Sequence, residues 1–144
     1  MIKLSHKTRK EIEMKKRFFI YIIIAHLLVP IFLILPIHRL RVGIGESISF
    51  ISIFEYIENA NNHLITAMLI VFIVIEFLGI ANAIYGIKTD GNHLSTRNSF
   101  ALGFSSAILG AMFLSFGSYI FFLVCAISFL VISYFSIRLM KMEK

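Results

Sequence analysis

The chain has 144 residues, of which 58% are hydrophobic, with a mean hydropathy of +0.87 and a formal net charge of +6. Soluble domains contain roughly 45–50% apolar residues in amphipathic patterns, whereas here the apolar residues come in blocks, which argues against a soluble domain. The single cysteine, Cys125, excludes an internal disulfide and any CxxC redox or zinc arrangement. The basic residues gather before the first apolar block without interleaved aromatics, which indicates membrane orientation and not a nucleic-acid site.

The N-terminal part combines a basic segment with a long apolar block. Residues 1–17 predict a short cytosolic helix that continues into the membrane, with a frayed solvated tail as the alternative. Residues 18–37 exceed the apolar core of a signal peptide and lack a cleavage site, so we expect a retained first transmembrane helix. This block contains His26, and Pro30 predicts a kink there, because it cannot donate to the carbonyl of His26.

The longest connection, residues 38–62, is expected outside the cytoplasm. Between residues 44 and 59 it has apolar residues at helical spacing, namely Phe50, Ile53, Phe54 and Ile57. We expect an amphipathic helix over 44–59 that lies in the membrane interface or caps the bundle. The competing interpretation is a strand pair, because residues 47–50 alternate in polarity and β-branched residues abound. The alternation fails at residue 51, which favours the helix.

The second apolar block, residues 63–87, is long enough to cross a bilayer and carries one carboxylate, Glu76, near its middle. The polar loop 88–98 follows, and we expect Asn98 or Ser99 to cap the next helix.

The remaining apolar residues run almost without interruption from 100 to 137. One helix of that length would measure about 57 Å, which is too long for a single crossing. A break at Gly117-Ser118 is therefore expected, with a third span over 99–116, a fourth over 119–138 and a cytosolic tail at 139–144. The fold predicted for residues 1–144 is a single all-α membrane domain of four transmembrane helices, with the extracytoplasmic amphipathic helix between the first two.

Small residues mark one face of each of the two middle spans. They are Gly79, Ala83 and Gly86 in the second span, on the same face as Glu76, and Gly103, Ala107 and Ala111 in the third. Small residues at such spacings let helices approach closely. We expect these two faces to pack on each other with the fourth span covering them, so that Glu76 faces a helix seam and not lipid.

The basic residues also predict the topology. If the N-terminus is cytoplasmic, then of the 14 Lys and Arg residues only Arg39 and Arg41 fall outside. The positive-inside rule therefore places both termini in the cytoplasm, with the chain in the cell membrane.

Glu76 is the first candidate for a functional residue, because a carboxylate at mid-bilayer costs about 2.5–3.5 kcal/mol on insertion scales. His26 is its natural partner, because helix geometry puts the two residues at depths of about 12 and about 16 Å from the cytoplasmic side. Our hypothesis is a buried hydrogen-bonded or ionic pair. We interpret this pair, or Glu76 with a serine, first as structural glue, second as part of a proton or cation relay, and last as catalytic.

Other chemistry finds little support in the sequence. No nucleophile, base and orienting group come together, so no catalytic residue is named. His38 and His63 flank the outer loop with Glu46, Glu55 and Glu58 between them, but the spacing matches no metal site, and we expect ordinary interfacial residues. We expect no metal and no cofactor.

In size, helix count and the use of a membrane-embedded glutamate, the chain is similar to the small multidrug resistance transporters. Their glutamate belongs to the first helix, whereas here the acid is Glu76 in the second and the first helix carries His26. The chain also has no tryptophan and a long outer connection. No family is assigned on this basis.

The expected function is that of a small non-enzymatic membrane protein acting through contacts in the bilayer, such as an accessory subunit or an immunity-type protector. Its partners would be the lipid bilayer and another membrane protein or a second copy of itself, and no nucleic acid. The alternative is a homo-oligomeric proton- or cation-coupled transporter that uses Glu76. A weaker alternative is an enzyme acting on a membrane lipid.

Overall fold

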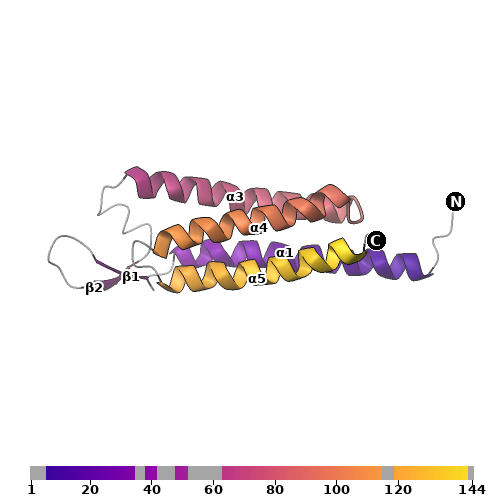
Figure 1. Ribbon diagram of the computed structural model, residues 1–144, viewed down its shortest axis with the longest axis horizontal. Coiled ribbons are helices and arrows are strands. Elements are labelled where there is room, and N and C mark those ends of the chain that lie inside the picture. Colours follow the sequence, from indigo (N-terminus) through magenta and orange to yellow (C-terminus); the bar gives the residue numbers. More distant parts are fainter. Residues whose placement is uncertain (1–5, 35–37, 42–47, 52–62, 115–118, 143–144) are drawn as a thin grey trace.

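The computed structural model describes residues 6–34, 38–41, 48–51, 63–114 and 119–142. Over these residues the chain forms helices α1 (His6–Ile34), α3 (His63–Lys88), α4 (His93–Leu114) and α5 (Tyr119–Met142) and strands β1 (His38–Arg41) and β2 (Ile48–Ile51). The helices lie lengthwise beside one another in an elongated bundle, with the hairpin of β1 and β2 at one end (Figure 1).

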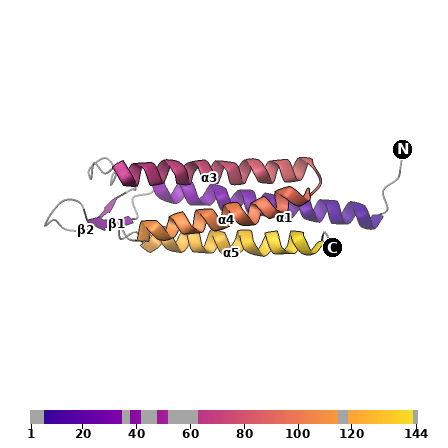
Figure 2. The same cartoon turned by 45° about the horizontal axis from the view of Figure 1, so that its top comes forward.

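Each helix of the bundle contacts two neighbours. α1 packs against α3 and α5, and α4 packs against the same two helices, so the four form a closed ring. α1 is continuous from the basic segment into the apolar block, with Pro30 inside the helix. Its N-terminal part extends beyond the ends of the other helices (Figure 2).

Two of the four predicted spans meet the length and composition needed to cross a membrane. They are Thr66–Lys88 within α3 and Phe122–Met142 within α5. α4 carries many hydroxyl and amide side chains, and only part of the apolar block of α1 lies within the described residues. The final apolar run forms two separate helices, α4 ending at Leu114 and α5 beginning at Tyr119, and the predicted break at Gly117-Ser118 lies outside the described residues.

The predicted amphipathic helix over 44–59 is wrong where the structure describes that segment. Residues 48–51 form β2, which pairs antiparallel with β1 in the register His38↔Ile51 to Arg41↔Ile48. The remainder of 44–59 lies outside the described residues. Pairing with β1 supplies backbone hydrogen bonds to a short segment rich in β-branched and aromatic residues, and this outweighs a helical spacing of four apolar positions.

The turn between α3 and α4 shows a second difference from expectation. Gly91, with φ +88°, donates its N–H to the carbonyl of Gly86 at 2.8 Å and closes the end of α3. The side-chain oxygen of Asn92 then accepts the N–H of Leu94 at 2.8 Å, so Asn92 caps α4. Asn98 and Ser99, expected as caps, lie inside the helix, because the polar residues from His93 onward are already helical.

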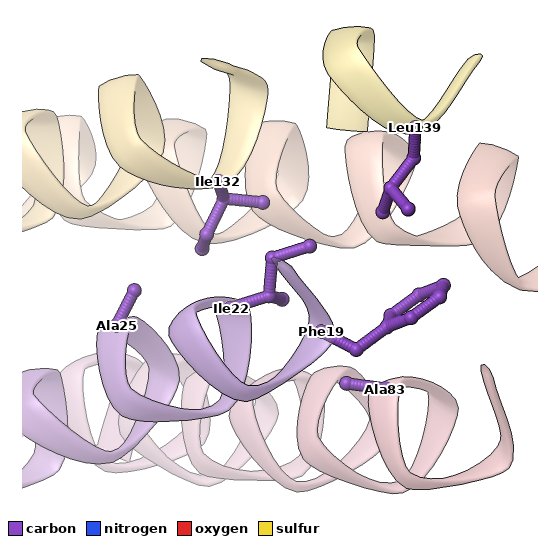
Figure 3. Close-up of a cluster of buried hydrophobic side chains, with 6 residues drawn as sticks. All are labelled: Phe19, Ile22, Ala25, Ala83, Ile132 and Leu139. Atoms are coloured by element: carbon purple, nitrogen blue, oxygen red, sulfur yellow. The ribbon is translucent and has the colours of Figure 1, made fainter. Parts of the chain in front are cut away.

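The apolar core lies where α1 passes between α3 and α5 (Figure 3). It comprises Phe19, Ile22 and Ala25 of α1, Ala83 of α3, and Ile132 and Leu139 of α5. All six side chains are at most 5% exposed. The ring of Phe19 lies against Gly86, where an added Cβ would come within 2.6 Å of the ring carbons.

The glycines do not join α3 to α4 as predicted. Gly79 and Gly86 of α3 lie against α1, and Gly103 and Gly110 of α4 lie against Ile132 and Cys125 of α5. Of the other small residues in the two stripes, Ala83 is buried, Ala107 is half-buried and Ala111 is exposed. α3 and α4 do contact each other. The glycines, however, pack against larger side chains from α1 and α5, because the missing Cβ leaves space for them.

Candidate functional site: a polar cluster inside the bundle

Three polar side chains from three helices meet inside the bundle. They are His26 of α1, Glu76 of α3 and Ser106 of α4, and they are 0%, 2% and 3% exposed. Each lies on a helix whose outer face is apolar, so the cluster is enclosed by the packing of the bundle. We call these three residues the polar cluster.

His26 and Glu76 are in direct contact. Nδ1 of the imidazole lies 2.6 Å from Oε2 of the carboxylate, across a sequence separation of 50 residues. The structure therefore places together the two residues that the sequence analysis proposed as a pair. It also turns Glu76 toward the neighbouring helices and away from the exterior.

Ser106 completes the cluster by donating its hydroxyl to Oε1, the second oxygen of Glu76. Both carboxylate oxygens thus have a partner, which is what makes a buried acid tolerable in a medium without water. The sequence analysis allowed a serine partner for Glu76 but did not assign that role to Ser106. Its position near the middle of α4, at the depth of Glu76 in α3, is the signal that could have identified it.

Gly79 holds the imidazole from the other side. A Cβ at this position would come within 2.5 Å of Cε1 and 2.8 Å of Cδ2 of His26. The ring therefore occupies the space left by the missing side chain, one turn along α3 from Glu76. Nε2 of His26 is buried and has no hydrogen-bond partner.

The order of the three groups limits their chemistry. In a serine hydrolase, the histidine stands between serine and acid, so that it can take the proton of the hydroxyl. Here the carboxylate stands between Ser106 and His26, and each of them is hydrogen-bonded to a different carboxylate oxygen. Ser106 is therefore not activated as a nucleophile by His26.

Metal binding also finds no support in the part of the chain that the structure describes. Within it, no three His, Cys, Asp or Glu residues gather as a metal site would require. His63 lies at the start of α3 and is exposed. The outer-loop carboxylates Glu46, Glu55 and Glu58 lie outside the described residues.

Other side-chain hydrogen bonds also join the helices, and sequence reasoning missed those of Asn82 and Ser128. The amide of Asn82 in α3 donates to the carbonyl of Ser95 at 2.9 Å and to Oγ of Ser99 at 3.0 Å, both in α4. Ser128 of α5 donates to the carbonyl of Ala25 in α1 at 3.3 Å. With the polar cluster, these bonds link α1 to α3 and α5, and α3 to α4.

Comparison of the chain with family models, with curated proteins and with solved structures gives no match. Function is therefore inferred from the residues of the bundle itself.

Proposed function

We propose that the chain is a small four-span protein of the cell membrane, with both termini in the cytoplasm, that acts through protein contacts in the bilayer. In this role the polar cluster locks the helices into one arrangement, and the outer surface meets lipid and a partner protein. An accessory subunit or an immunity-type protector fits this description.

The observation that carries the proposal is the reversed distribution of polarity in the bundle. Large hydrophobic side chains are exposed on every helix, among them Ile24 and Leu28 of α1, Phe77 and Leu78 of α3, Phe104 and Ile108 of α4, and Leu123 and Leu130 of α5. Meanwhile His26, Glu76 and several serines are buried. In water such a surface would aggregate, whereas in lipid it is the expected one.

The charge distribution supports the proposed orientation. Lys16 of α1 pairs with Asp90 of the α3–α4 turn at 3.0 Å, so the basic segment and this turn share one end of the bundle. The C-terminal end of α5 lies at the same end, and β1, which carries Arg39 and Arg41, lies at the opposite end (Figure 1). The positive-inside rule then favours a cytoplasmic location for the first end.

The polar cluster supports a structural role for Glu76. Each of its two oxygens has a hydrogen-bond partner inside the bundle, His26 for Oε2 and Ser106 for Oε1. Interhelical hydrogen bonds of this kind stabilise membrane bundles by about 0.6–2 kcal/mol each.

Orientation is tested by cysteine labelling in a Cys125→Ser background. Lys10→Cys and Lys141→Cys should resist a membrane-impermeant maleimide in intact cells, whereas Leu40→Cys in β1 should react. Labelling of either terminal position from outside would overturn the topology.

Contact function is tested by purification from native membranes in a mild detergent. We expect a partner in fixed stoichiometry whose association is lost when exposed apolar residues such as Phe77 are replaced by alanine, while the fold is retained. A chain that purifies alone and carries flux in liposomes would contradict the proposal.

A second candidate is a proton-coupled transporter, and one observation favours it. Nε2 of His26 is buried without a partner beside an intramembrane carboxylate, an arrangement that a proton relay would need. Flux in proteoliposomes under a pH gradient tests this, with Glu76→Gln against the exposed control Glu13→Gln. Loss of flux in Glu76→Gln but not in Glu13→Gln would establish transport. Absence of flux in the wild type would exclude the transporter.

A further inference from the structure

A groove of about 390 Å³ lies on the outside of the bundle between α3 and α4. Its apolar lining comes from Leu78 and Ala81 of α3 and from Ala101 and Leu102 of α4. The alanines keep it shallow and open, and the leucines give it walls. The groove is separate from the polar cluster, because His26, Glu76 and Ser106 are not among its lining residues.

Two cations stand at the end of the groove that the proposed orientation places in the cytoplasm. Lys88 lies seven residues after Ala81, which is two helical turns along the same face of α3. Arg97 lies four residues before Ala101, one turn along the same face of α4. Both side chains are exposed.

Neither cation is neutralised within the part of the chain that the structure describes. The nearby acid, Asp90, is paired with Lys16 at 3.0 Å. Lys88 and Arg97 form no ion pair with a described carboxylate. The short turn between α3 and α4 keeps both cations at the same end of the groove, where they favour an anion.

An amide occupies the next level of the groove. Asn98 lines it and is exposed on the outer face of α4, directly after Arg97. An amide facing lipid is unfavourable unless it has a hydrogen-bond partner, because hydrocarbon offers none. The neighbouring Asn82 has its own amide group already bonded to Ser95 and Ser99, so Asn98 is the one available to a ligand.

We propose that this groove binds an anionic phospholipid of the cytoplasmic leaflet. The phosphate lies between Lys88 and Arg97, the amide of Asn98 donates to the glycerol ester region, and one acyl chain lies over Ala101 and Leu78. The proposal rests on the membrane orientation proposed above. Charge favours this occupant over a transmembrane helix of a second copy, whose apolar surface would leave both cations and the amide without partners.

Lipid titration of the purified, delipidated protein in detergent tests the site. Phosphatidylglycerol should raise the thermal unfolding temperature of wild type at lower concentrations than phosphatidylcholine does, because a ligand that binds only the folded state stabilises it. A cation near the membrane surface contributes about 1 kcal/mol, or about fivefold in affinity. Lys88→Gln combined with Arg97→Gln should therefore weaken phosphatidylglycerol binding about 30-fold.

The matched control removes the same charge away from the groove. Lys10→Gln combined with Lys141→Gln should leave the preference for phosphatidylglycerol unchanged. Ala101→Leu, which fills the groove, should weaken the binding of both lipids. Native mass spectrometry should show one bound phosphatidylglycerol on wild type and none on Ala101→Leu at the same lipid concentration.

Three outcomes would overturn the proposal. They are an equal response of wild type to the two lipids, an equal loss in the control pair, and a lipid-free dimer that Ala101→Leu dissociates, which would assign the groove to a second copy. The cysteine labelling described above separates this failure from failure of the proposed orientation. A correctly oriented bundle with no preference for phosphatidylglycerol would contradict the lipid site alone.

Discussion

The imidazole of His26 lies directly over Gly79, in the space where any other residue would carry its Cβ. The same ring contacts Glu76 at 2.6 Å. One glycine on α3 thus sets the position of the α1 histidine, and the histidine in turn satisfies the acid one turn away on α3.

Replacement of Gly79 by alanine should destabilise the bundle by about 1–3 kcal/mol, because the new methyl group displaces the imidazole. In a His26→Ala background, the same change should stabilise it by about 0.5–1 kcal/mol, since alanine favours a helix over glycine. Thermal unfolding of the four proteins in detergent measures the difference. An equal effect of Gly79→Ala in both backgrounds would show that the ring does not depend on this glycine.

His26 and Glu76 should show energetic coupling. His26→Ala and Glu76→Ala each leave a buried polar partner unsatisfied, whereas the double variant removes both groups. We expect a coupling energy of about 1–2 kcal/mol from the double-mutant cycle, measured by unfolding in detergent. Additive losses would refute a contact between the two residues.

Ser106 and Ser105 offer a comparison between neighbouring serines. Ser106→Ala removes the donor to Oε1 of Glu76 and should cost about 1–3 kcal/mol, because that oxygen is buried. Ser105 bonds only to the carbonyl of Ala101 in its own helix, and Ser105→Ala should change stability by less than about 0.5 kcal/mol. Unfolding in detergent measures both losses of stability. Similar losses for the two variants would show that Ser106 is not the partner of Glu76.

The start of α4 can be tested through its cap. Asn92→Ala should cost about 1 kcal/mol, because the N–H of Leu94 loses its acceptor. Asn98→Ala, inside the helix, should leave the unfolding free energy nearly unchanged. A loss of stability for Asn98→Ala but not for Asn92→Ala would indicate that α4 begins near Asn98, as the sequence suggested.

Cys125 should report on the contact between α4 and α5. Its side chain is 2% exposed and lies against Gly110, so a maleimide should not react with the folded protein and should react fully after denaturation in SDS. Gly110→Ala pushes the two helices apart and should raise the labelling rate of the folded form. Rapid labelling of folded wild type would contradict the packing of these helices.

The helices could be predicted from the sequence because their signals are local. The apolar block that contains Glu76 becomes α3, and the length of the final apolar run requires a break, which separates α4 from α5. The contact between His26 and Glu76 could also be anticipated, because a fixed rise per residue sets the depth of each side chain once the spans are placed. The sequence did not assign Ser106 as the partner of Glu76, since several serines lie on α4.

The sequence by itself determined that the long apolar blocks form helices and that an acid and a histidine lie within two of them, because length and composition act along a single segment. Only the tertiary structure decided that Gly79 receives His26 and Gly110 receives Cys125, and that residues 48–51 pair with β1 instead of forming a helix. Those outcomes depend on the shape of the facing helix and on a strand partner supplied from elsewhere in the chain. A glycine stripe indicates that a neighbouring helix packs closely against it. The sizes of the side chains on the neighbouring helices determine which of them fills the space.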